Sequence, residues 1–212
     1  MKIKVCGLKV DENIEAVAAL NPDYIGFIFY RPSPRFVDDL HHQILKQIPA
    51  SIYKTAVFVN EDSDAINELI DRYDFNAIQL HGDESPEFCA SFKNKVKVIK
   101  AFGLNNFNFG QLNAFVGKVD FFLFDAKTEI YGGSGKTFNW NELDNYKLDV
   151  PFFLSGGLAL ENLEDVKKIT HPQFYGVDLN SKFETAPGIK DIEKLEKAFS
   201  LIKQTYSNEL RS

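Results

Sequence analysis

Eight short apolar runs alternate with amphipathic stretches along the chain, and this alternation limits the possible folds more than any other feature. The apolar runs predict strands at residues 3–8, 24–30, 53–59, 77–80, 97–102, 120–124, 151–154 and 174–179. The stretches between and after them predict helices at residues 11–20, 38–48, 62–73, from 85 onward, 107–116, near 140, 161–169 and 192–206. Strands that alternate with helices pair in parallel, and a parallel strand buried on both faces reads as an unbroken apolar run. Eight such units favour a closed (β/α)₈ barrel, and an open doubly wound sheet is the alternative.

The length and composition fit one barrel. With 212 residues, the chain is at the short end of the roughly 200–250 residues of such folds. Hydrophobic residues make up 44% of it, including 20 Phe, which is ample material for a core. No stretch reads as a linker or a low-complexity segment. The sequence therefore predicts a single domain over residues 1–212.

Charge and cysteine content exclude several classes of partner. The net charge is −6 and no run of Lys or Arg occurs, which argues against nucleic acid or an anionic membrane as a partner. A local basic pocket for a small anion is compatible with this balance. Cys6 and Cys89 lack the spacing of a disulfide framework or a zinc site. The beginning of the sequence lacks the apolar run of a signal peptide, and no segment reaches the roughly 20 apolar residues of a membrane span. We therefore expect a cytoplasmic protein.

Residues 121–138 form the most informative stretch. A buried strand ends here at Asp125, and a loop with three glycines and Lys136 follows. A carboxylate at the C-terminal end of a parallel strand is where an α/β enzyme places its chemistry, although Asp125 could instead cap the next turn. Residues 135–137 resemble the end of a nucleotide-triphosphate loop, but that motif requires a glycine where Ile130 stands. A dinucleotide motif starting at residue 133 likewise requires a glycine in place of Phe138.

Polar residues gather where the predicted strands end, while the strand interiors stay apolar. In a barrel these ends meet at one mouth, which is where the active site lies. The residues concerned are Cys6, Arg35, His81, Asp83, Asp125, Ser155, Gly156, Gly157, Asp178, Asn180 and Ser181. Their clustering is more informative than any single member.

The residues after the seventh and eighth strands predict a phosphate site. Gly156 and Gly157 let backbone N–H groups approach an anion closely, and the chain from Asn180 to Gly188, with Ser181, can supply the N-terminus of a short extra helix. Together these form the usual phosphate cradle of such barrels. The alternative is that the two glycines only make a tight turn.

Cys6 and Asp125 are predicted to lie on opposite sides of that phosphate site, because strand 6 reaches strand 1 through strands 7 and 8. One acid and one base facing each other across a sugar phosphate suit proton transfer. A thiol has an unperturbed pKa of about 8.5, so nearby positive charge would be needed to raise the thiolate fraction. Alternatively, Cys6 is a buried filler, as we expect for Cys89.

Two further residues at the predicted mouth allow two interpretations each. Arg35 suits a bidentate grip on a carboxylate, or it is an ordinary surface arginine. His81 is either a ligand-facing donor or a histidine whose hydrogen bonds are satisfied at a strand end, and its position alone slightly favours the second.

Ordered motifs lie at or near the predicted strand ends along the whole chain: residues 4–8 (KVCGL), 26–29 (GFIF), 33–37 (SPRFV), 79–84 (QLHGDE), 124–125 (FD), 132–138 (GGSGKTF), 154–158 (LSGGL) and 176–178 (GVD). In these motifs the chain resembles the phosphoribosylanthranilate isomerase family of tryptophan biosynthesis. The resemblance implies a barrel of the ribulose-phosphate-binding type. It also implies an Amadori rearrangement of N-(5-phosphoribosyl)anthranilate to 1-(2-carboxyphenylamino)-1-deoxyribulose 5-phosphate.

The resemblance also implies roles for single residues. Asp125 would be the general acid that opens the ribose ring, and Cys6 the general base that removes the C2 proton. Arg35 would hold the anthranilate carboxylate, and Asp178 a ribose hydroxyl. The other implied ligand contacts are His81 for the substrate and Gly156, Gly157, Asn180 and Ser181 for the phosphate. No metal or organic cofactor is implied, and the phosphorylated substrate is the expected partner of a monomer or homodimer.

One departure and two alternatives remain. Lys182 stands where the family usually has a glycine in the phosphate loop, so it either adds charge there or points to solvent. A relative of indole-glycerol-phosphate synthase would favour a strand-end lysine, for which Lys100 is the sole candidate. A non-catalytic sugar-phosphate sensor on the same scaffold would bind ligand without needing Cys6 or Asp125.

Overall fold

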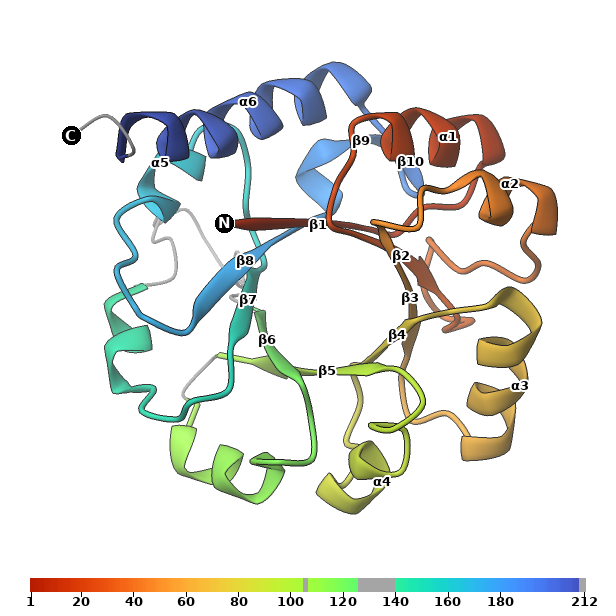
Figure 1. Ribbon diagram of the computed structural model, residues 1–212, viewed down its shortest axis with the longest axis horizontal. Coiled ribbons are helices and arrows are strands. Elements are labelled where there is room, and N and C mark those ends of the chain that lie inside the picture. The colour runs from red at the N-terminus through yellow and green to blue at the C-terminus, as the bar shows by residue number, and fades with distance from the viewer. Residues whose placement is uncertain (105–106, 126–139, 210–212) are drawn as a thin grey trace.

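In the computed structural model, which describes residues 1–104, 107–125 and 140–209, eight parallel strands close into a barrel (Figure 1). Neighbouring strands pair in chain order, and β1 pairs with β8 to close the ring. The strands are β1 (Lys2–Cys6), β2 (Tyr24–Ile28), β3 (Tyr53–Phe58), β4 (Ala77–Leu80), β5 (Lys97–Gly103), β6 (Phe121–Asp125), β7 (Phe152–Ser155) and β8 (Phe174–Leu179). The predicted (β/α)₈ barrel is confirmed, and the open sheet is wrong.

Helices surround this barrel on the outside (Figure 1). The α-helices are α1 (Asp11–Ala19), α2 (His42–Gln47), α3 (Ser63–Tyr73), α4 (Pro86–Ala90), α5 (Leu163–Val166) and α6 (Ile192–Glu209). Short 3₁₀ helices are η1 (Phe109–Phe115), η2 (Trp140–Asn145) and η3 (Ser181–Phe183). Sequence signals start two of the α-helices: Asp62 accepts from the Asp64 N–H before α3, and Ser85 accepts from the Phe88 N–H before α4. None of the helices in the described ranges has the length and apolarity to cross a bilayer.

Three predicted helices differ from the structure. The stretch 107–116 is the 3₁₀ helix η1, because Asn108 accepts from the Gly110 N–H and Asn113 donates to the Gly110 carbonyl. Such local side-chain bonds compete with the α-helical ladder. The helix near residue 140 is also 3₁₀, and only one α-helical turn forms within 161–169. The loop at residues 126–139, with Lys136, lies outside the described residues.

The barrel has two apolar layers. Alternate strand residues face the helices and form the larger cluster, whereas a smaller cluster fills the barrel interior. The interior cluster consists of Tyr24, Ile99, Ala101, Phe121, Leu123 and Phe153, with Tyr53 and Tyr175 packed against it. The Tyr24 ring stacks on Tyr53 at 4.8 Å and meets Phe153 edge-on at 5.2 Å. Because Tyr24 and Phe121 begin their strands, these rings close the N-terminal end and leave the C-terminal end for polar groups.

A hairpin that the sequence did not predict follows β8. Its strands, β9 (Glu184–Ala186) and β10 (Ile189–Lys190), pair antiparallel and lie beside α1 (Figure 1). The Asn13 side chain on α1 fixes the hairpin, since its amide donates to the Lys190 carbonyl at 2.9 Å and its oxygen accepts from the Lys190 N–H at 2.7 Å. The hairpin is therefore held in a defined position against α1.

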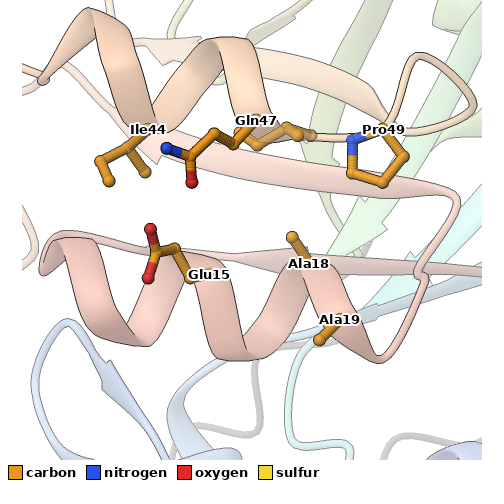
Figure 2. A pocket seen from close by; sticks show the side chains of 7 residues that line it. Glu15, Ala18, Ala19, Ile44, Gln47 and Pro49 are labelled. Atoms are coloured by element: carbon orange, nitrogen blue, oxygen red, sulfur yellow. The ribbon is translucent and has the colours of Figure 1, made fainter.

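A groove separates α1 from α2 on the outer surface (Figure 2). Its lining residues include Glu15, Ala18, Ile44, Gln47 and Pro49. None of the site residues predicted from the sequence lines this groove. The predicted chemistry must therefore be sought at the ends of the strands.

Candidate active site

The strand ends bring the predicted acid and base to the same mouth. Cys6 ends β1 and Asp125 ends β6, and both side chains point inward, because their neighbours Val5 and Phe124 belong to the outer cluster. Asp178 on β8 points inward by the same alternation, between Val177 and Leu179. Cys6 is 3% exposed and Asp125 is 9% exposed. The structure thus places the thiol and the carboxylate on separate strands of one interior.

Gly26 on β2 makes room for the Cys6 thiol. The two residues are register partners, and a Cβ atom on Gly26 would lie 2.6 Å from Cys6 Sγ. The same Cβ would lie 3.2 Å from the Cys6 Cα, so the flexible side chain alone could not relieve the clash. The sequence marks Gly26 only as part of a motif, and the structure shows that its missing side chain leaves the space that the Cys6 thiol occupies.

Two buried lysines act on the Cys6 thiol. Burial raises the pKa of Cys6, while the positive charges of Lys4 and Lys190 lower it and the Asp178 carboxylate raises it. Burial is the larger effect, so the pKa of the free protein's thiol lies above its ordinary value. The positive charge that the sequence argument required is present, but in this state it only limits the shift.

Lys4 and Asp178 form an ion pair inside the barrel. Lys4 Nζ lies 3.0 Å from Asp178 Oδ1, and both side chains are buried. Burial opposes the charge on Lys4, but the Asp178 carboxylate and the Cys6 sulfur outweigh it and raise the pKa of Lys4. One oxygen of Asp178 is therefore committed to Lys4, and Lys4 is a functional candidate that sequence reasoning missed. The signal was a charged residue inside an otherwise apolar strand.

His81 lies beside Asp125 and not away from the mouth. Its Nε2 is 3.6 Å from Asp125 Oδ2, and its side chain is 32% exposed. On the other side of the ring, Gln79 Nε2 lies 2.9 Å from His81 Nδ1. If Gln79 donates this bond, the proton of a neutral His81 stays on Nε2, facing Asp125. This arrangement favours the ligand-facing interpretation of His81 over the structural one.

Arg35 is not a free surface arginine. Its Nε lies 2.9 Å and 3.1 Å from the two carboxylate oxygens of Glu184, and its Nη2 lies 2.6 Å from Glu184 Oε2. This hydrogen bonding raises the pKa of Arg35. Glu184 also accepts from Lys190 Nζ at 2.6 Å, and Lys190 Nζ donates to Asn180 Oδ1 at 2.7 Å. The bidentate edge predicted for a ligand is thus already occupied by Glu184.

The predicted phosphate residues lie after neighbouring strands, because β7 pairs with β8. Gly156 has φ of 87° and Gly157 has φ of 66°, a left-handed backbone that a side chain would strain. Ser181 and Lys182 begin η3 and are exposed, whereas the Asn180 side chain is used by Lys190. The glycines and Ser181 therefore follow neighbouring strands at the mouth, and Lys182 is exposed beside Ser181.

Lys100 does not provide a strand-end amine. It lies between two residues of the interior cluster, so its side chain points toward the helices. It is 2% exposed and forms an ion pair with Glu84 at 3.2 Å. It also donates to the carbonyl oxygens of Leu80, Gly82 and Ala101. This geometry removes the feature on which the indole-glycerol-phosphate synthase alternative depended.

Among the described residues, no group of three or more His, Cys, Asp or Glu side chains could hold a metal ion. The mouth contains a thiol, a carboxylic acid with a neighbouring imidazole, two glycines with positive φ and an arginine held by a glutamate. Fold and site together define a (β/α)₈-barrel protein with an acid–base site that suits an anionic ligand.

Comparison with known proteins narrows this class. A family model described as N-(5'phosphoribosyl)anthranilate (PRA) isomerase matches residues 3–200. The N-(5'-phosphoribosyl)anthranilate isomerase of Parabacteroides distasonis is 45% identical over 200 residues, covering 92% of this chain and 90% of the relative. That of Phocaeicola vulgatus is 41% identical over 206 residues, covering 96% and 98%. The chain belongs to the N-(5'-phosphoribosyl)anthranilate isomerase family.

Solved structures agree with this assignment. The phosphoribosyl anthranilate isomerase of Thermus thermophilus superposes with a TM-score of 0.79 at 27% identity, covering 97% of this chain and all of that one. A complex of such an isomerase with reduced 1-(o-carboxyphenylamino)-1-deoxyribulose 5-phosphate gives a TM-score of 0.77 at 27% identity, covering 96% and 99%. A monomeric form of the dimeric enzyme from Thermotoga maritima gives 0.75 at 27% identity, with the same coverage.

Proposed function

We propose that this protein isomerises N-(5-phosphoribosyl)anthranilate to 1-(2-carboxyphenylamino)-1-deoxyribulose 5-phosphate in tryptophan biosynthesis. The observation that carries the mechanism is the placement of Cys6 and Asp125 on opposite sides of the strand ends that would hold the phosphate. Strands β7 and β8 separate β6, with Asp125, from β1, with Cys6. A sugar phosphate bound over these two strands therefore has one of the two groups on each side.

Asp125 is the general acid of the first step. It donates a proton to the ribose ring oxygen, the C1–O bond breaks, and the anthranilate nitrogen lone pair forms the C1=N iminium. His81 Nε2 lies 3.6 Å from Asp125 Oδ2 and faces the carboxyl group from one side. A positioned acid or base of this kind contributes about 10²–10⁴-fold to the rate.

Cys6 is the general base of the second step. Its thiolate removes the C2 proton, and the electron pair moves toward the iminium nitrogen to give an enolamine that tautomerises to the ketone. The nearby Lys4 and Lys190 charges favour the thiolate that this step needs. The iminium itself accepts the electrons, so the proposed route uses no metal or organic cofactor.

Binding groups surround these two residues. The backbone of Gly156, Gly157 and Ser181 holds the phosphate, with Asn180 shaping the loop through its bond from Lys190. The carboxylate of the anthranilate ring meets the end of Arg35 that Glu184 leaves open. Asp178 receives a ribose hydroxyl on the oxygen that Lys4 does not use. We further propose a cytoplasmic monomer or homodimer that binds this phosphorylated small molecule and no nucleic acid.

A fluorescence assay tests this function against the sensor alternative. Anthranilate-containing substrate changes its fluorescence as it is converted, so an enzyme at a hundredth of the substrate concentration produces the full change. A sensor on the same scaffold produces a change limited to the amount of protein added. Full conversion supports the proposed function, and a stoichiometric signal contradicts it.

A further inference from the structure

Glu184 holds Arg35 in one orientation. It occupies the Nε–Nη2 edge of the guanidinium through three contacts of 2.9, 3.1 and 2.6 Å. The Glu184 side chain is 5% exposed, and Arg35 keeps 19% of its side chain accessible. No acceptor for Arg35 Nη1 is found among the described residues. The Nε–Nη2 edge of the guanidinium is therefore taken by Glu184, and Nη1 is the end left for a ligand.

Lys190 in turn holds Glu184. Its side chain is fully buried and lies 2.6 Å from Glu184 Oε1 and 2.7 Å from Asn180 Oδ1. Its backbone is fixed by the two bonds with Asn13 on α1. A continuous set of contacts thus runs from Asn13 through Lys190 and Glu184 to Arg35. It joins α1, the β9–β10 hairpin and the loop after β2.

Glu184 is paired with two cations, Arg35 and Lys190, and this sets the net charge of the cluster. An isolated Arg–Glu pair is neutral and would attract a carboxylate only weakly. Burial lowers the pKa of Lys190, and the Glu184 carboxylate at 2.6 Å opposes that shift. With Lys190 protonated, the three side chains together carry +1. Burial opposes the Glu184 carboxylate, but the hydrogen bonds from Arg35 and Lys190 outweigh burial and lower its pKa. The neighbouring Lys4–Asp178 pair is neutral as a unit and leaves this +1 uncompensated.

We propose that Glu184 and Lys190 are positioning residues that give the protein its selectivity for a ligand with a ring carboxylate. Glu184 fixes the direction of Arg35, and Lys190 restores the positive charge that Glu184 would otherwise cancel. Neither residue touches the reacting atoms. This inference rests on the proposed function for the identity of the ligand, but its test does not need turnover.

The test compares the binding of two non-reacting ligands by isothermal titration. One is reduced 1-(o-carboxyphenylamino)-1-deoxyribulose 5-phosphate, and the other is the same molecule without the ring carboxylate. In the unmodified protein the first binds at least about tenfold more tightly, as expected for one charge-assisted contact. Glu184→Gln and Lys190→Met each reduce this ratio to below about threefold. Glu184→Gln does not change the affinity for the ligand without the carboxylate by more than about threefold.

Glu84→Gln is the matched control. Glu84 is also a buried glutamate paired with a lysine, Lys100, but it lies on the β4–β5 side of the barrel. The Glu84→Gln variant is expected to leave the ratio of the two ligand affinities unchanged. A loss of both ligands in parallel in Glu184→Gln would indicate a merely structural role and overturn the proposal, as would an unchanged ratio. If the ratio behaves as expected but the unmodified protein shows no turnover, the proposed function fails and the positioning role stands.

Discussion

The two sides of the mouth differ in how firmly their functional groups are held. On the β1–β8 side, the charges of two buried lysines, Lys4 and Lys190, act on Cys6. Both lysines are held by ion pairs: Lys4 pairs with Asp178, and Lys190 pairs with Glu184, which also pairs with Arg35. On the β4–β6 side, the partly exposed His81 imidazole at 3.6 Å is the ionisable side chain found beside Asp125 among the described residues. Fixed buried charges thus act on the pKa of the base, Cys6, whereas the acid, Asp125, has a single longer contact with a partly exposed side chain.

This difference follows from what each group must do. A thiol buried in an apolar barrel holds its proton tightly, so it needs nearby cations to act as a base. A carboxylic acid that gives up a proton to a ring oxygen does not need a cation beside it, because a cation would lower its pKa and take the proton away. The comparison therefore predicts that mutations on the two sides change activity by different routes.

The largest effects are expected at the two reacting groups. Asp125→Asn and Cys6→Ala each lower kcat by at least about 10²-fold, because each removes one proton-transfer group. The measurement is steady-state turnover of N-(5-phosphoribosyl)anthranilate. Cys89→Ala is the matched control, since Cys89 is also a fully buried thiol but belongs to α4, outside the mouth. Near-normal kcat in either site variant, with an intact fold, would refute the role of that residue.

A smaller loss of activity is expected from Lys4→Met, which removes one of the two buried positive charges beside Cys6. Loss of the Lys4 charge raises the pKa of Cys6 further, so less thiolate is present at a given pH. The acidic limb of the kcat/KM profile then moves to higher pH, and activity at pH 7 falls by about tenfold for each unit of displacement. The pH dependence of iodoacetamide reaction with Cys6 reports the same shift without turnover.

The control for Lys4→Met addresses the buried carboxylate that it leaves unpaired. The variant is expected to lose about 3–5 kcal/mol of unfolding free energy because Asp178 loses its partner. Combining it with Asp178→Asn restores much of the stability. It restores only part of the alkylation rate at pH 7, because Asp178 raises the pKa of Cys6 by less than Lys4 lowers it. Full recovery of both would show that Lys4 acts only through packing and not on Cys6.

The smallest effect is expected on the acid side. Gln79→Leu removes the partner of His81 Nδ1 and loosens the ring beside Asp125. One neutral hydrogen bond contributes about 1 kcal/mol, which corresponds to about a fivefold loss of kcat. The acidic limb assigned to Cys6 stays in place, because Gln79 lies on the other side of the barrel. A shift of that limb would show that the two sides are not independent.

The sequence predicted the barrel because its buried parallel strands are unbroken apolar runs. All eight strands lie within two residues of their predicted ends, including the strand that places Asp125 at the mouth. The placement of Cys6 and Asp125 on either side of strands β7 and β8 also followed from the ring order, since β1 pairs with β8. Such patterns are set by burial and chain order, which can be read along a single sequence.

Other parts of the site depend on contacts between distant segments. Nothing near Arg35 in the sequence indicates that Glu184 occupies one edge of its guanidinium, because the contact crosses 149 positions. Lys4 and Gln79 were visible as polar residues within apolar strands, but their partners were not. The 3₁₀ helix η1 was missed because the asparagines at 108 and 113 bond locally, which overrides the apolar pattern.

The most direct test of the central claim is a crystal structure of the protein with reduced 1-(o-carboxyphenylamino)-1-deoxyribulose 5-phosphate. The account predicts that the phosphate lies over Gly156, Gly157 and Ser181, with Cys6 Sγ within about 4 Å of C2. It also predicts the Asp125 carboxyl group on the opposite side of the same pentose. The account would be contradicted if the Cys6 thiol or the Asp125 carboxyl group did not reach the bound ligand, or if both lay on the same face of the sugar.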